Sequence, residues 1–246
     1  MGNERNGCEQ VEFELNGRKG IMICPKTAAF GKPWVWRAEF LHAFDYADNA
    51  LLELGWHIAY YQLSDMFGCP SAVRQMETFR EYIVDEFSLE PKAVLFGFSR
   101  GGLYAFNYAA AYPDRVTALY LDAPVLDIRS WPGGKGEGIG SPADWQACLA
   151  VYQITDEEAD AFDQNPLDVA HHAAAAGIPI IVVAGDSDMV VPYRENGAVL
   201  ERKYRELGGT IEVILIEGRE HHPHSLEDPQ PIVDFIKTAR QKASLT

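Results

Sequence analysis

Residues 92–102 read Lys-Ala-Val-Leu-Phe-Gly-Phe-Ser-Arg-Gly-Gly, and this stretch decides the fold. Residues 93–98 are a continuous apolar run, which is typical of a parallel strand buried on both faces. Residues 101–112 follow with a helical pattern that the next residue, Pro113, ends. The strand and the helix enclose Gly-x-Ser-x-Gly, a motif that chance alone produces often but that is informative in this context. The stretch therefore predicts a sharp turn from strand to helix at Ser99.

The turn predicts Ser99 as a nucleophile. Side chains at positions 97 and 101 would crowd a strained backbone, and glycine relieves that crowding. The hydroxyl is then exposed above the sheet, at the positive end of the following helix. We expect the backbone N–H of Arg100 to form half of an oxyanion hole. The Arg100 side chain either pairs with a surface acid, which we favour, or binds an anionic group of a substrate.

A serine hydroxyl needs a base to take its proton and an acid to orient that base. The sequence offers both, in the order Ser, Asp, His. After the apolar run at 178–184 comes Gly-Asp-Ser-Asp-Met-Val-Val-Pro (185–192), which resembles the G-x-x-D-x-x-V-P segment common in the α/β-hydrolase superfamily. The resemblance implies Asp188 as the acid, with Asp186 as the alternative. One of the two aspartates can instead have a purely structural role as the cap of a turn, and we expect this role for Asp186.

The base lies after the run at 211–216, in Gly-Arg-Glu-His-His-Pro-His (218–224). This segment resembles the Gly-x-x-His usual at this place in the same superfamily, and the resemblance implies His221 as the base, with His222 as the alternative. Three histidines in four residues also suggest a metal, but this spacing on a proline-containing loop is unusual for ligands, and no acidic cluster accompanies it. We therefore predict neither a metal nor another cofactor.

The remaining chain alternates strands and helices, which predicts an α/β fold with a mostly parallel central sheet flanked by helices, in a single domain spanning 1–246. Strands are expected at 11–15, 20–24, 56–63, 93–98, 116–121, 178–184 and 211–216, and helices at 33–54, 72–87, 101–112 and 231–243. Residues 127–177 contain no strong strand. We interpret them as a small cap or lid over the carboxyl ends of the strands, where ligands bind in such sheets. The alternative is a pair of packing helices.

Composition limits the partners. The chain has 21 Lys+Arg against 36 Asp+Glu, a net charge of -15, which disfavours nucleic acid. No apolar run is long enough to span a membrane, and the polar N-terminal residues do not resemble a signal peptide, although a trimmed export signal is an alternative. Four cysteines without a short Cys-x-x-Cys pair favour a reducing compartment. We therefore expect a cytoplasmic protein; the sequence leaves its oligomeric state open.

Over nearly its whole length the sequence resembles the α/β-hydrolase superfamily, and within it bacterial acetyl-xylan-esterase and prolyl-oligopeptidase-type hydrolases. Residues 31–37, 98–104 and 221–226 carry the narrower likeness. The resemblance implies a second oxyanion donor after the strand 20–24, where many relatives have His-Gly. This chain has Cys-Pro-Lys-Thr there (24–27). Because proline has no N–H, the expected donor is the backbone of Lys26 or Thr27.

Together these features predict a hydrolase of carboxylic esters. Trp34, Trp36 and Trp131 are candidate substrate contacts, because aromatic platforms suit sugars, and a small acyl group on a carbohydrate is the preferred substrate. The alternative for each tryptophan is core packing. The alternative functions are a peptidase or amidase with the same triad, and a catalytically silent binding protein with this fold.

Overall fold

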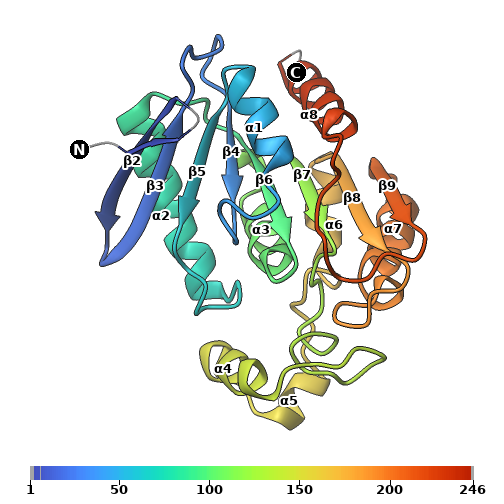
Figure 1. Ribbon diagram of the computed structural model, residues 1–246. Helices are drawn as coiled ribbons and strands as arrows, with labels where there is room; N and C mark the ends of the chain where they lie inside the picture. Colours follow the sequence, from blue (N-terminus) through green and yellow to red (C-terminus); the bar gives the residue numbers. More distant parts are fainter. Residues whose placement is uncertain (1–2, 6, 245–246) are drawn as a thin grey trace.

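The computed structural model describes residues 3–5 and 7–244. Within them the chain forms a nine-stranded sheet with the order β1-β2-β3-β5-β4-β6-β7-β8-β9 (Figure 1). The strands are β1 (Asn3–Arg5), β2 (Cys8–Leu15), β3 (Arg18–Cys24), β4 (Trp34–Arg37), β5 (His57–Tyr61), β6 (Ala93–Phe98), β7 (Val116–Asp122), β8 (Ile180–Gly185) and β9 (Ile211–Ile216).

The direction of the strands decides where a site can form. β1, β2, β3 and β5 pair in antiparallel fashion, whereas β5, β4 and β6 to β9 are parallel neighbours. The carboxyl ends of six strands therefore meet at one edge, where loops from different strands converge. The predicted strands at 93–98 and 211–216 have the predicted bounds, and the expected mostly parallel α/β sheet is confirmed.

Helices cover both faces of the sheet (Figure 1). One face packs against α1 (Tyr46–Glu53) and α8 (Gln230–Ala243). The other packs against α2 (Pro70–Phe87), α3 (Gly101–Ala111), α6 (Ala170–Ala175) and α7 (Gly197–Glu206). Short 3₁₀ turns lie at Pro113–Arg115 and Tyr193–Glu195. β6 is buried along its whole length between these two layers, as its apolar sequence predicts.

The helix predicted at 33–54 is wrong in its first half. Residues Trp34–Arg37 form strand β4, and the helix α1 starts only at Tyr46. Trp34 and Trp36 face one core layer and Val35 the other, so the period is two. Arg37 is fully buried: its guanidinium contacts Asp48 and stacks on the Phe98 ring at 3.9 Å. The strand is only four residues long and includes a charged residue that is buried. Its sequence therefore lacks the longer apolar pattern by which a buried strand is recognised.

Residues 127–177, the expected cap, contain α4 (Pro142–Tyr152), α5 (Asp156–Asp160) and α6. α4 and α5 lie beyond the carboxyl ends of the strands (Figure 1). α6, by contrast, packs against α3 and α7 as part of the helical layer. α4 and α5 therefore lie where the cap was expected, whereas α6 packs as the alternative describes; a lid role for α4 and α5 stays a prediction, and cap is used below for their position alone. Trp145 and Cys148 of α4 join the main core cluster.

Two general features complete the fold. In the described residues, no helix is both long and apolar enough to cross a membrane. Cys8, Cys24, Cys69 and Cys148 are all free thiols.

Candidate active site

The turn after β6 holds Ser99 in a left-handed backbone conformation with a φ of 49°. Its N–H donates to the carbonyl of Asp122 at 2.9 Å, and its carbonyl accepts from the N–H groups of Gly102 and Val125 at 2.9 Å each. A left-handed conformation is costly for a residue with a side chain, and here bonds to the neighbouring strand β7 and the loop after it hold the residue in place. The Ser99 side chain is consequently presented at the carboxyl edge of the sheet.

Glycines are required around this turn for steric reasons. A Cβ on Gly97 would lie 2.9 Å from the carbonyl oxygen of Gly101, and one on Gly102 would lie 2.7 Å from that of Val125. Real Cβ atoms do not approach backbone oxygens this closely. Gly97 is thus required, as the sequence predicts, whereas the second strict requirement falls on Gly102, just after the motif; a Cβ on Gly101 would lie 3.2 Å from Glu39 Cβ, a tight contact but not a clash with backbone.

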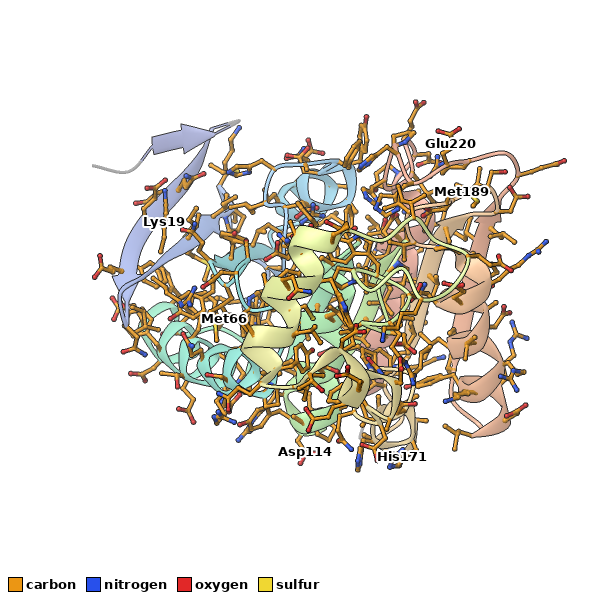
Figure 2. The ribbon with its side chains drawn as sticks, turned by 90° about the horizontal axis from the view of Figure 1, so that it is seen from below. Lys19, Met66, Asp114, His171, Met189 and Glu220 are labelled. Atoms are coloured by element: carbon orange, nitrogen blue, oxygen red, sulfur yellow. The ribbon has the colours of Figure 1, made fainter. Side chains whose placement is uncertain are left out.

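Three side chains from three strand ends form a chain of hydrogen bonds. Ser99 Oγ lies 3.0 Å from His221 Nε2, and His221 Nδ1 lies 2.7 Å from Asp188 Oδ2. The other Asp188 oxygen accepts from the N–H groups of Val190 and Val191 at 2.8 Å each. The loops after β8 and β9 are joined by the bond from Ser187 N–H to the Arg219 carbonyl at 3.1 Å, and Figure 2 labels Met189 and Glu220, which flank this acid and base on the two loops. The sequence-predicted triad residues are thus in mutual contact.

The alternative residues have other partners. Asp186 is exposed, and its Oδ1 accepts from the backbone N–H of Gly218 and the hydroxyl of Ser187. It bridges the two loops rather than facing Ser99. His222 is exposed and stacks on the Phe44 ring, with centroids 5.9 Å apart. The geometry therefore favours Asp188 and His221 over these neighbours.

The predicted oxyanion donor at Lys26 is wrong for a topological reason. Lys26 follows β3, which runs antiparallel to β5 and pairs Ile23 with Ile58 near the start of that strand. Lys26 therefore lies at the edge where the parallel strands begin, whereas Ser99 lies where they end. The same holds for Thr27. Because residues 34–37 were predicted as helix, the loop at the correct edge was missed.

The loop that does reach Ser99 follows β4, the parallel neighbour of β6. A Cβ on Gly101 would lie 3.2 Å from Glu39 Cβ and 3.6 Å from Glu39 N, so Glu39 packs directly on the start of α3. Among the described residues, no acceptor is found for the backbone N–H of either Arg100 or Glu39. These two N–H groups are therefore candidate donors to a negative oxygen beside Ser99.

A buried ion pair joins these two residues. Arg100 Nη2 lies 2.9 Å from Glu39 Oε2, and the Glu39 side chain is only 1% exposed. Burial raises the pKa of Glu39, while the Arg100 charge opposes that rise. Burial lowers the pKa of Arg100, but Glu39 more than compensates and leaves it raised. The Arg100 side chain thus pairs with an acid, as predicted, but that acid is buried rather than on the surface.

Two of the three predicted tryptophan contacts are wrong. Trp34 and Trp36 are each 1% exposed on β4. Trp34 Nε1 donates to the carbonyl of Glu90, and the Trp36 ring packs against Phe79 and Tyr108. Both are core residues, because the strand that carries them is central in the sheet.

Trp131 is different from these two. It is half-buried at the start of the cap, with its ring centroid 6.2 Å from that of Phe67. Phe67 and the half-exposed Phe40 in turn lie beside the Arg100 guanidinium, at 5.4 and 5.7 Å. The Phe67 ring, only 2% exposed, thus contacts both Trp131 and the Arg100 guanidinium, and Phe40 lies beside the same guanidinium.

A second buried acid–base pair lies behind the nucleophile, and sequence reasoning missed it. Asp122, the last residue of β7, accepts from His224 Nδ1 at 2.7 Å, from Ser225 N at 2.8 Å and from the Tyr120 hydroxyl at 2.8 Å. The available signal was the polar residue at the end of an apolar strand, beside the nucleophile turn. No pattern in the sequence connects that residue with His224, about a hundred positions later.

A separate cavity of about 340 Å³ lies between α2, α3 and the cap. Its lining is mostly apolar and includes Val73, Tyr152 and Phe162, with Asn107 and His172 as polar members. Asn107 is two turns along α3 from Ser99, so this cavity is not the triad site.

Comparison with known proteins agrees with this description. A family model described as alpha/beta hydrolase fold matches residues 68–153, a segment with the Ser99 turn but not Asp188 or His221. No curated protein sequence matches the chain. The fold is the α/β-hydrolase fold, and the sequence resembles that family over residues 68–153.

Two solved peptidase structures illustrate the likeness. A puromycin-hydrolyzing peptidase from Mycobacterium tuberculosis has a TM-score of 0.71 at 13% identity, over 93% of this chain and 38% of that one. An acylaminoacyl peptidase from Pyrococcus horikoshii has a TM-score of 0.69 at 14% identity, over 95% and 40%. The chain therefore spans about two fifths of the length of these peptidases.

A third structure matches from end to end. It is a chain provisionally named a lipase, from Acinetobacter baumannii, with a TM-score of 0.58 at 17% identity, over 96% of this chain and 93% of that one. At these identities the likeness establishes the fold alone.

Proposed function

We propose that this protein is a serine hydrolase that cleaves carboxylic esters. The observation that carries the proposal is the continuous chain from Ser99 Oγ to His221 to Asp188, with contacts of 3.0 and 2.7 Å. Nucleophile, base and orienting acid in this order are what acyl transfer by a hydroxyl requires.

The chemistry follows from these positions. His221 Nε2 accepts the Ser99 proton as Oγ attacks the ester carbonyl carbon, and Asp188 stabilises the imidazolium. The N–H groups of Arg100 and Glu39 donate to the negative oxygen of the tetrahedral intermediate. His221 then gives its proton to the leaving alcohol. Water, deprotonated by His221, attacks the acyl-enzyme and releases the acid and the free serine.

The substrate proposal differs from the sugar ester expected from the sequence. With Trp34 and Trp36 in the core, the aromatic argument for a carbohydrate loses two of its three residues. The half-exposed Phe40 and the half-buried Trp131 instead support an apolar or aromatic group in the substrate, whereas Phe67, at 2% exposure, is a core residue. The end-to-end match to the chain named a lipase supports ester cleavage. The higher TM-scores of the peptidases support the second candidate, a peptidase or amidase with the same triad.

The test combines a covalent probe with two substrate classes. We expect a fluorophosphonate to label Ser99, p-nitrophenyl acetate to be hydrolysed faster than aminoacyl anilides, and Ser99→Ala to abolish both labelling and turnover. Ser187→Ala, which removes an exposed hydroxyl in the acid loop, is the matched control and should behave as the wild type. Faster anilide cleavage would favour the peptidase. No labelling of a folded wild type would favour a silent binding protein.

A further inference from the structure

Three imidazole rings gather beside the nucleophile on the loop after β9. The ring centroids of His221, His222 and His224 lie 4.8 to 4.9 Å apart, and the three rings are steeply inclined to one another. One ring nitrogen of each lies within 4.8 Å of those of the other two. The sequence spacing argued against this convergence, but the folded loop brings His224 back beside the other two rings.

Buried carboxylates orient two of the three rings. Asp188 binds Nδ1 of His221, and Asp122 binds Nδ1 of His224, each at 2.7 Å. Backbone N–H groups hold both carboxylates in turn. Because each carboxylate fixes a proton on Nδ1, each ring offers the lone pair of Nε2. A histidine held this way by a carboxylate is the usual outer arrangement of a metal-binding histidine.

We propose that His221, His222 and His224 bind a transition-metal ion such as Zn²⁺ or Cu²⁺, and that this ion reversibly inhibits the enzyme. Imidazole ligands suit these metals and not Mg²⁺ or Ca²⁺. Zn–N bonds of about 2.0–2.1 Å need ligand nitrogens closer together than 4.8 Å, so the rings close on the ion. His222 is the exposed ring of the three, so binding the ion would shift it relative to the Phe44 ring on which it stacks.

Inhibition follows from the double use of one nitrogen. Nε2 of His221 is the atom that contacts Ser99 Oγ at 3.0 Å. When its lone pair binds the ion, it cannot accept the Ser99 proton. No covalent bond of the protein is made or broken, so removal of the ion by a chelator restores the base. This consequence rests on the proposed function, whereas binding of the ion does not.

Binding is tested directly, by calorimetric titration of the purified protein with ZnCl₂ and by the visible spectrum of bound Co²⁺. We expect one ion per chain at the loop. His222→Gln should weaken Zn²⁺ binding by at least about tenfold, because loss of an outer partner alone costs about 10- to 100-fold. The matched control is His171→Gln, which removes one ring of the exposed pair His171–His172 on α6 and should not alter loop binding.

Activity gives the second measurement. With p-nitrophenyl acetate, Zn²⁺ should inhibit the wild type, EDTA should reverse the inhibition, and MgCl₂ should have no effect. For each variant, the rate with Zn²⁺ is divided by that variant's own metal-free rate. The Zn²⁺ concentrations that halve this ratio are then compared between variants. Equal Zn²⁺ affinity of His222→Gln and wild type would overturn the proposal, as would Zn²⁺ binding without inhibition. An inactive protein that binds Zn²⁺ through His222 would refute the proposed function but keep the site.

Discussion

At the scale of single residues, the site depends on two aspartates that differ in burial and partners. Asp188 is buried, with one oxygen on His221 and the other on two backbone N–H groups. Asp186, two positions earlier, is exposed and bridges to Gly218. Only the first can fix the proton of His221 on Nδ1 and leave Nε2 free to receive the Ser99 proton.

This difference gives the first mutational prediction. Asp188→Asn should lower kcat for p-nitrophenyl acetate by about 10⁴-fold, because an amide N–H facing Nδ1 places the imidazole proton on Nε2. Asp186→Asn keeps an oxygen for the Gly218 N–H, and its kcat should match the wild type. Steady-state kinetics of both purified variants decide the matter. A larger loss of kcat in the Asp186 variant would show that Asp186, and not Asp188, is the acid.

At the scale of elements, the sequence predicted those parts that its local pattern encodes. The buried strand 93–98, its glycine turn and the following helix each have a local signal, and the structure has all three. Strand β4 has four residues and ends in Arg37. The buried charge of Arg37 is compensated by Asp48 and by hydrogen bonds to the carbonyls of Phe40 and Ala43. Such compensation comes from tertiary contacts, so the pattern concealed the strand.

The same reason explains which site residues were missed. The acid and base after β8 and β9 carry local motifs, and the structure places both beside Ser99. The backbone of Glu39 was not predicted, because its role depends on which strand is the neighbour of β6. The pair Asp122–His224 joins the end of β7 to the loop after β9, and only the sheet order brings them together.

The Arg100–Glu39 pair connects two elements, the start of α3 and the loop after β4. Arg100→Met leaves the buried Glu39 carboxylate without its cation. We expect a loss of about 3 kcal/mol in the free energy of unfolding, at the lower end of the usual range because Arg100 is partly exposed. The double variant Arg100→Met/Glu39→Gln should recover most of this loss. Urea denaturation of both variants and of Glu39→Gln measures the coupling; additive effects would show that the pair is energetically unimportant.

At the scale of the whole molecule, the net charge of -15 surrounds a site whose own Arg100 is neutralised by Glu39. The field of the protein therefore attracts positive substrates and repels negative ones at low ionic strength. Salt weakens this effect, since the screening length falls from about 30 Å at 0.01 M to about 3 Å at 1 M.

We therefore predict that a trimethylammonium-substituted phenyl acetate has a higher kcat/KM than its carboxylate-substituted analogue near 0.01 M ionic strength. The ratio of the two values should fall steadily as NaCl is added, while kcat/KM for unsubstituted phenyl acetate stays nearly constant as the control. The physical reason is that salt screens distant surface charges far more than contacts within the site. If the ratio is the same at 0.01 and 1 M, the preference comes from groups that touch the substrate, and the acidic surface does not select among esters.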